Sequence, residues 1–106
     1  MAAISRPYIL TAGAADDIRE IARYTDRQWG KQQREAYVAQ LEKVATDLAL
    51  GKGVFRERND VYPGVRVQLA GHHFVFCLPR KAEPALILAV LHERMDLVAR
   101  LTGRLP

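Results

Sequence analysis

Two amphipathic patterns separated by a single Trp-Gly pair constrain this chain more than any other feature of its sequence. The first pattern places apolar or small residues at helical spacing: Ile18, Ile21, Ala22, Thr25 and Trp29. The second advances in steps of four, three and four residues: Tyr37, Leu41, Val44 and Leu48. Gly30 ends the first helix, since glycine readily adopts the conformation that follows a helix end. The second helix is expected from about Lys31 to Leu50, closed by Gly51. Because the turn is so short, the two helices must run antiparallel as a hairpin.

A short strand is predicted before the hairpin. Tyr8 to Thr11 is rich in residues that favour strands. Thr11 can also cap the helix that follows. Asp16 and Asp17 are expected in or near the first turn of that helix, where carboxylates interact favourably with the helix dipole.

The second half of the chain has the pattern of a strand meander. An aperiodic loop is expected from Gly51 to Gly64, with Phe55 and Tyr62 as its candidate anchors. The elements predicted after it are a strand at 65–69, a strand at 73–78, a polar hairpin loop at 79–84, an apolar strand at 85–91 and a short helix at about 95–101. The order is therefore β-α-α-β-β-β-α. We predict an α+β fold, an antiparallel sheet with the N-terminal helical hairpin packed on one face, as a single domain over residues 1–106.

Composition places the chain among small globular proteins. Of its 106 residues, 49% are hydrophobic and 26% are charged. The net charge of +4 suits nucleic acid, an acidic protein partner or simple solubility, and does not choose between them. The longest apolar run, Ala85 to Leu91, is too short to cross a bilayer, and Met1 to Pro7 lack the layout of a signal peptide. The single cysteine, Cys77, excludes an internal disulfide. We therefore expect a cytoplasmic protein without membrane contact.

The sheet is predicted to have more apolar surface than the hairpin can cover. The strand at 73–78 is largely apolar on both faces, and so is the strand at 85–91. A bare apolar face is unusual for a monomer, which predicts a partner chain, either a second copy or a different protein. The alternative is that the last helix folds back and closes the gap. Tyr24, Trp29 and Tyr37 are expected in the core of the hairpin, and Cys77 in the core of the sheet.

Few residues suggest catalytic chemistry. We expect neither a metal nor a cofactor, because the adjacent His72 and His73 would point to opposite faces of a strand, and His92 is distant in the sequence. One enzymatic alternative is RNA cleavage by 2′-hydroxyl attack, which needs a base, an acid and cations around the phosphate. The residues of these types are Arg66, His72, His73, His92 and Arg94. Histidines at strand ends are more often structural, bonded to a neighbouring loop.

From Tyr8 to Leu101 the chain resembles the ParE branch of the RelE/ParE toxin superfamily. The resemblance rests on an ordered set of motifs: Tyr8-Ile9-Leu10-Thr11; Ala14, Asp17 and Ile18; Ile21, Tyr24-Thr25 and Trp29-Gly30; Gln33, Tyr37 and Leu41; Gly64-Val65-Arg66; Gly71-His72 with Val75-Phe76; and Val90-Leu91-His92-Glu93-Arg94-Met95-Asp96. The Tyr-Thr and Trp-Gly pairs, together with the Leu-His-x-x-Met-Asp ending, are the most specific of these.

The resemblance implies the toxin half of a bacterial type II toxin–antitoxin pair, silenced by a ParD-like antitoxin encoded beside it. ParE-type toxins inhibit DNA gyrase and are not enzymes of the RNA-cutting kind, and their complexes contact DNA through the antitoxin. The expected toxicity surface lies just after the last strand and comprises His92, Arg94, Met95, Asp96 and Arg100. The residues expected to bind the antitoxin, or to form the core of the cradle that holds it, are Ile18, Ile21, Trp29, Tyr37, Leu41, Phe74 and Phe76.

Two other functions stay open from the sequence. RelE-type relatives cut mRNA in the ribosome, and here the catalytic candidates would be Arg66, His92 and Arg94. A non-toxic module that only binds antitoxin is the second alternative. The chain also departs from the ParE pattern, which often has tyrosine and arginine after the strand phenylalanine. Cys77 and Leu78 stand there instead and predict a less polar central surface.

Overall fold

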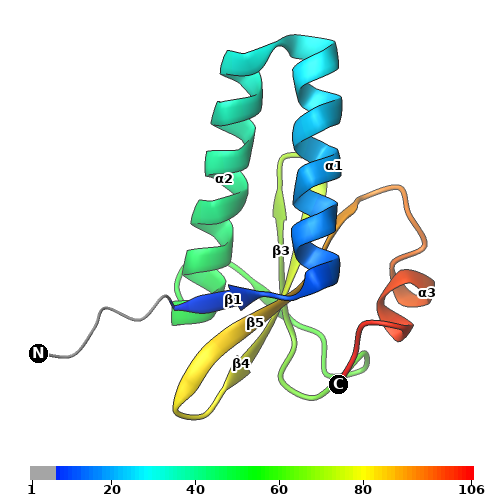
Figure 1. Cartoon of the computed structure of the whole chain (residues 1–106). Coiled ribbons are helices and arrows are strands. Elements are labelled where there is room, and N and C mark those ends of the chain that lie inside the picture. The colour runs from blue at the N-terminus through cyan, green and yellow to red at the C-terminus, as the bar shows by residue number, and fades with distance from the viewer. Residues whose placement is uncertain (1–6) are drawn as a thin grey trace, which may run out of the picture.

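One mixed sheet of five strands carries the helical hairpin on one face and a short helix on the other (Figure 1). The computed structural model describes residues 7–106, so the expectation about Met1 to Pro7 falls almost wholly outside the described residues. The elements are β1 (Tyr8–Leu10), α1 (Ala12–Trp29), α2 (Lys31–Leu50), β2 (Arg56–Glu57), β3 (Arg66–Ala70), β4 (His73–Arg80), β5 (Glu83–His92) and α3 (Leu97–Thr102). The strands lie in the order β1-β5-β4-β3-β2. The α+β class and the hairpin on one face are confirmed.

Two strand pairings were not anticipated from the sequence. β1 runs parallel to β5, with Ile9 opposite Leu86, so the sheet is mixed. β2 pairs with β3 inside the segment that was predicted to be loop throughout. Two residues are too few to display an alternating pattern. Arg56 and Glu57 form a strand because they pair with β3, which their own sequence does not indicate.

The connection between β4 and β5 is tighter than predicted. β4 continues to Arg80 and β5 begins at Glu83, so a two-residue turn replaces the expected polar loop at 79–84. Pro79 cannot donate a ladder hydrogen bond, and the register shifts between Leu78 and Arg80, where an irregularity accommodates it. Ala82, in the turn, has a positive φ of 58°.

The hairpin forms as predicted, because the signals that define it are local. Thr11 caps α1, since its hydroxyl accepts a hydrogen bond from the Ala14 N–H at 3.2 Å. Gly30 has a φ of 92° and serves both helices as a cap. α2 runs from Lys31 to Leu50, where Gly51 closes it in the left-handed conformation. Asp16 and Asp17 follow directly after the first turn of α1, which begins at Ala12, so they lie near that turn rather than in it.

The core consists of two apolar layers, one on each face of the sheet. The layer under the hairpin joins α1 and α2 to the strands and contains Ala14, Ile21, Leu41, Val44, Ala45, Leu48, Ala70, Val75, Cys77, Ala85, Ile87 and Val90. The layer on the other face contains Val65, Val67, Phe76, Leu78, Leu88, Ala89, Leu91 and Leu101. The two faces of β4 divide as predicted, with Val75 and Cys77 on one side and Phe76 and Leu78 on the other.

The second face of the sheet is not bare, which corrects the argument for a partner drawn from it. Phe76 and Leu88 are each 1% exposed and Leu91 is 2% exposed. Leu101 of α3 lies in the same cluster, and residues of the 58–62 segment and of the tail pack around it. The alternative in which the last helix closes the gap is therefore the correct one. This face of the sheet therefore gives no reason to expect a partner chain.

Candidate functional site

A hollow lies between the outer part of the hairpin and the end of β5. It has a volume of about 780 Å³. The residues that line it are Glu20, Ile21, Tyr24, Thr25, Trp29, Gln33, Tyr37, Gly71, His72, His73, His92 and Met95. They come from α1, α2, the β3–β4 turn, the start of β4, the end of β5 and the segment after it. The hairpin therefore forms one wall and the end of the sheet forms the other (Figure 1). We call this hollow the cleft.

Two large aromatic side chains in the cleft are open to solvent. Trp29 is 71% exposed and Tyr24 is 57% exposed, so the expectation that both belong to the hairpin core is wrong. Residues at helical spacing share one side of a helix whether or not that side is buried, so the spacing alone could not tell the two cases apart. The outer part of the hairpin extends past the sheet, which therefore does not cover it (Figure 1). Large aromatic rings that lie exposed side by side are typical of a site that binds a partner.

The residues predicted for the antitoxin cradle separate into three groups. Ile21, Trp29 and Tyr37 line the cleft. Leu41 and Phe76 are each 1% exposed and belong to the core, on opposite faces of the sheet. The other two predicted residues are partly buried and pack against the two apolar layers: Ile18 and Phe74.

The Tyr37 hydroxyl joins α2 to the β3–β4 turn. It lies 3.1 Å from the Ala70 carbonyl oxygen and 2.7 Å from His73 Nδ1, and it accepts a hydrogen bond from the His72 N–H at 3.0 Å. Burial raises the pKa of Tyr37 above its ordinary value, against the opposing effect of the His72 N–H. Gly71 allows this close approach, since a Cβ atom there would lie 2.5 Å from the ring of Tyr37. These bonds tie α2, in the hairpin wall of the cleft, to the turn in the wall formed by the end of the sheet.

The three histidines of the chain gather at this wall. The rings of His72 and His92 stack with centroids 6.2 Å apart, and those of His73 and His92 meet edge to face at 5.2 Å. His92 was treated above as distant, but His73 is its direct cross-strand partner. Burial, followed by the neighbouring imidazoles of His92 and His72, lowers the pKa of His73 to about 4. Within residues 7–106, no group of three or more His, Cys, Asp or Glu is arranged to hold a metal ion.

Each histidine uses its Nδ1 atom in a hydrogen bond with a neighbour. His72 Nδ1 lies 2.7 Å from a Glu93 carboxylate oxygen, and this bond lowers the pKa of Glu93. His92 Nδ1 accepts from the Arg94 N–H at 3.1 Å. His73 Nδ1 pairs with Tyr37, as described above. Each of the three rings is thus held by a hydrogen bond to a neighbouring residue, as a structural role would require.

The arginine and histidine set considered for RNA cleavage is not assembled. Arg66 donates to the Leu48 carbonyl oxygen at 2.7 Å, and its guanidinium group lies 5.0 Å from the centre of the Phe55 ring. Arg66 of β3 pairs with Cys77 of β4, and Cys77 pairs with Ile87 of β5, so Arg66 and Ile87 lie at the same height along the sheet. Ile87 precedes His92 by five residues, about 16 Å along a strand. Arg66 therefore lies at the base of the hairpin, away from His92 and Arg94.

The residues predicted for the toxicity surface run from His92, the partly buried last residue of β5, to Arg100 in α3. His92 and Met95 line the cleft, and Met95 is 40% exposed. Arg94, Asp96 and Arg100 are exposed and are not among the residues that line the cleft. Asp96 also caps α3, since its carboxylate accepts from the Ala99 N–H at 3.2 Å.

The departure from the family pattern at Cys77 and Leu78 does not alter the surface. Cys77 is fully buried and Leu78 is 9% exposed, on opposite faces of the sheet. The expectation of a less polar central surface is therefore wrong, because both side chains pack in the core. Burial raises the pKa of the Cys77 thiol to about 11.

Parts of the cleft had no signal in the sequence. Glu20 belongs to a polar helix face and was not singled out, and Gln33 entered only through the family resemblance. The histidine cluster depends on the register between β4 and β5, which periodicity does not specify.

Across residues 7–106, no helix has both the length and the apolar character that crossing a membrane requires.

Comparison with known proteins agrees with this architecture. Residues 8–97 match the family model described as ParE toxin of type II toxin-antitoxin system, parDE. The chain is 52% identical over 98 residues to Toxin ParE of Escherichia coli, covering 92% of this chain and 95% of that one. It is 30% identical over 93 residues to Toxin ParE1 of Mycobacterium tuberculosis strain H37Rv, covering 88% and 95%.

The fold also matches a solved structure. A chain of the chromosomal ParDE TA system from P. aeruginosa superimposes with a TM-score of 0.64 at 19% identity, covering 80% of this chain and 92% of that chain. The matches together define a toxin of a type II toxin–antitoxin system. Within that class, the chain belongs to the ParE toxin family.

Proposed function

We propose that this ParE-type toxin inhibits DNA gyrase, and that a ParD-like antitoxin silences it by binding over the cleft. The observation that carries the second part is the exposure of Trp29 and Tyr24 beside Met95. Large aromatic side chains are the usual anchors of protein interfaces, because they bury much area at low entropic cost. The likeness to a ParE toxin at 52% identity supports the same pairing with an antitoxin.

The position of the cleft suggests how binding would silence the toxin. His92 and Met95 belong both to the lining of the cleft and to the proposed toxicity surface. A segment of antitoxin that buries Trp29 therefore covers part of the toxicity surface directly. The Tyr37 hydroxyl already bonds to the β3–β4 turn in the chain by itself, so the proposal requires no change of shape in the toxin.

The proposed inhibition is non-enzymatic and takes place in the cytoplasm, with residues 1–106 acting as one toxin domain and without a cofactor. The separation of Arg66 from His92 supports this choice over mRNA cleavage, because cations and proton-transfer groups must meet around one phosphate. The exposed segment with Arg94, Met95, Asp96 and Arg100 is the part proposed to contact gyrase.

A supercoiling assay tests the target. Purified toxin is added to gyrase and relaxed plasmid, and the DNA is examined with and without protein denaturation. We expect loss of supercoiling and an accumulation of cleaved plasmid that is released by denaturation. A toxin that leaves supercoiling intact but produces cut mRNA in a translation reaction would replace gyrase with the ribosome as the target. A chain that does neither, yet binds antitoxin, would be the non-toxic binding module.

Binding of the antitoxin is tested with a pair of matched variants. Trp29→Ala removes the exposed ring in the cleft, and Val54→Ala removes an apolar side chain that is 88% exposed elsewhere. We expect the Trp29 variant to bind the co-expressed antitoxin at least tenfold more weakly, and the Val54 variant to bind as the parent does. Equal affinities for the two variants would place the antitoxin on another surface.

A further inference from the structure

Two imidazole nitrogens at the surface of the cleft are free to bind a ligand. In both His73 and His92, Nδ1 bonds to a neighbour, whereas Nε2 forms no hydrogen bond within residues 7–106. In the same part of the chain, Gln68 Oε1 is the only buried side-chain nitrogen or oxygen atom that lacks a partner. The Nε2 atoms of His73 and His92 are therefore not buried but reach solvent, and both rings line the cleft.

The hydrogen bonds around His73 fix the position of its ring proton. The Tyr37 hydroxyl has a single proton, and the Ala70 carbonyl oxygen, 3.1 Å away, can only accept it. The hydroxyl oxygen can then accept from both the His72 N–H and a proton on His73 Nδ1. This tautomer satisfies all three contacts, whereas the other one leaves the Ala70 contact without a proton. His73 Nε2 is therefore an acceptor, and burial keeps the ring neutral, since it lowers the pKa to about 4.

His92 has the opposite polarity. Its Nδ1 accepts a hydrogen bond from the Arg94 N–H at 3.1 Å, so the ring carries its proton on Nε2. His92 Nε2 is therefore a donor. The rings of His73 and His92 meet edge to face with their centroids 5.2 Å apart. The cleft thus presents one acceptor and one donor on neighbouring rings.

We propose that His73 and His92 bind a side-chain carboxamide of the antitoxin, from an asparagine or a glutamine. The amide N–H₂ group donates to His73 Nε2, and the amide oxygen accepts from His92 Nε2–H. This inference rests on the proposed function, because it names the group by which the cleft recognises the antitoxin segment that covers it.

The polarity of the two nitrogens excludes charged side chains. A carboxylate cannot donate to His73 Nε2, and an ammonium or guanidinium group cannot accept from His92 Nε2–H. Either would leave one ring nitrogen unbonded once the antitoxin covers it, and an unsatisfied buried polar group costs free energy. A carboxamide has its donor and its acceptor on separate atoms about 2.3 Å apart, so it can meet two rings at once.

Two other neutral groups also donate and accept, but they suit this place less well. A hydroxyl group does so through one oxygen, which must lie within hydrogen-bond distance of both rings. A main-chain amide reaches the partly buried rings only if the backbone enters the hollow, where its neighbouring peptide groups would lose water without gaining partners. A side chain reaches the imidazoles while the main chain stays at the rim, on the exposed ring of Trp29.

Three small molecules of similar shape test this polarity directly. Propionamide, propionate and propylammonium are each titrated into full-length toxin whose histidine rings are labelled with ¹⁵N. The ¹⁵N signals of the toxin alone report which nitrogen carries the proton in His73 and in His92. We expect propionamide to shift the Nε2 signals of both rings, and the two ions to leave them in place. 1-Propanol serves as the arm for a hydroxyl group, and N-methylacetamide as the arm for a main-chain amide.

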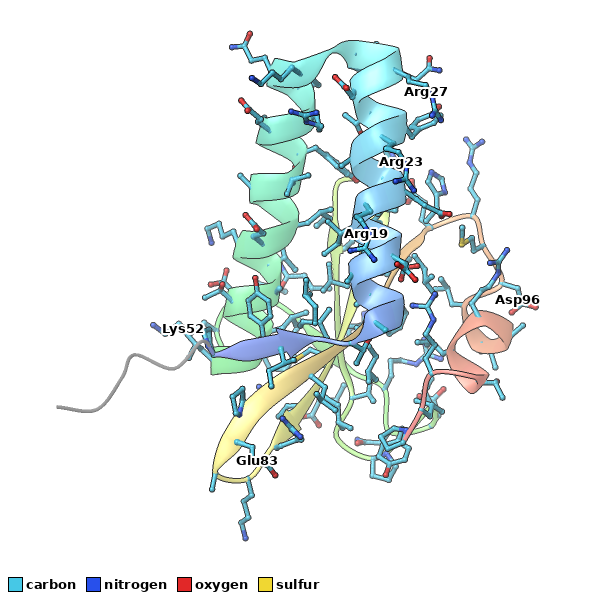
Figure 2. The ribbon with its side chains drawn as sticks, in the orientation of Figure 1. Arg19, Arg23, Arg27, Lys52, Glu83 and Asp96 are labelled. Carbon is cyan, nitrogen blue, oxygen red and sulfur yellow. The ribbon has the colours of Figure 1, made fainter. Side chains whose placement is uncertain are left out.

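Variants of His92 test the same group in the complex. His92→Asn keeps an acceptor for the Arg94 N–H but loses the donor, whereas His92→Gln places an amide N–H₂ group near the position of Nε2. We expect His92→Asn to bind the co-expressed antitoxin about threefold to tenfold more weakly, the effect of one lost hydrogen bond, and His92→Gln to recover most of the loss. Lys52→Ala is the control. Lys52 lies at the base of the hairpin (Figure 2), outside the lining of the cleft, and its variant should bind as the parent does.

Several results would overturn the proposal. A ring proton on His73 Nε2 or on His92 Nδ1 would remove its basis, and so would equal shifts caused by propionate or propylammonium. A stronger effect of 1-propanol or N-methylacetamide would make a hydroxyl group or the main chain the recognised group. Equal affinities of His92→Asn and the parent, beside weaker binding by Trp29→Ala, would overturn only this inference. Unchanged binding by both of these variants would also overturn the placement of the antitoxin over the cleft.

Discussion

Arg104, which follows α3, forms a two-pronged ion pair with Asp17 of α1. The two guanidinium nitrogens lie 2.6 and 3.0 Å from the two carboxylate oxygens. Asp17 also accepts a hydrogen bond from the Val90 N–H at 2.9 Å, and Arg104 donates to the Leu88 carbonyl oxygen at 3.2 Å. The pair therefore ties the tail and the hairpin to β5, beside the segment that carries the proposed toxicity surface.

Asp17→Asn should destabilise the protein. The side chains of Asp17 and Arg104 are only 13% and 25% exposed, so the variant leaves a mostly buried guanidinium group without its counter-charge. We expect a loss of about 2 kcal/mol in the free energy of unfolding, seen as a Tm lowered by roughly 10 °C. Asp16→Asn breaks the exposed pair with Arg19 and should change stability by less than about 0.5 kcal/mol. Similar losses in both variants would contradict a special role for the Arg104 pair.

Gly71→Ala should disturb the cleft wall. A Cβ atom at this position would lie 2.5 Å from the Tyr37 ring, and Gly71 has a φ of 61°, which other residues adopt at a cost. We expect a loss of about 1–3 kcal/mol in urea unfolding, because Tyr37 must shift and abandon some of its hydrogen bonds. Gly103→Ala is the control, since no atom would meet a Cβ there within 4 Å. An unchanged Gly71 variant would show that the ring moves aside freely.

Acidification should weaken the fold through His73. Its pKa is about 4 in the folded protein and about 6.5 when unperturbed, so between these values the unfolded state binds more protons than the folded state does. The stability contributed by neutral His73 is complete above about pH 6.5 and is lost progressively as the pH falls toward 4. Urea unfolding at several pH values measures this slope. In His73→Asn the slope over the same interval should be smaller, and a slope equal to the parent's would assign the effect to other groups.

Cys77 should be inert in the folded protein. It is fully buried, and burial raises its pKa to about 11, so almost no thiolate exists near neutral pH. An aromatic disulfide reagent at pH 8 should therefore label the thiol only after denaturant is added. Rapid labelling of the native protein would mean that the sheet opens locally around β4.

Asp96 has two proposed roles, which two substitutions separate. Asp96→Ala removes the cap of α3 and should cost about 1 kcal/mol in stability, whereas Asp96→Asn keeps a capping side chain. If the carboxylate belongs to the toxicity surface, Asp96→Asn should reduce gyrase inhibition while its Tm stays near that of the parent. Full inhibition by the Asn variant would restrict Asp96 to capping.

Local signals determined the hairpin and the composition of the two faces of the sheet. Thr11, Gly30 and Gly51 mark helix ends through their own backbone and side-chain preferences, so the bounds of α2 follow from the sequence. The alternation in β4 likewise predicts which residues share a face of the sheet. These features depend on residues within a few positions of one another, and the order in which distant segments pair does not affect them.

The tertiary structure alone decided the features that join distant segments. The parallel pairing of β1 with β5 and the ion pair of Asp17 with Arg104 each span most of the chain, and the cover that α3 gives the second face joins it to strands earlier in the second half. The histidine cluster depends on one register, in which His73 stands opposite His92. The same helical period that buries Ile21 leaves Trp29 exposed, because burial depends on how far the sheet extends under the hairpin. Periodicity shows which residues share a face, whereas only the packed chain decides what, if anything, covers that face.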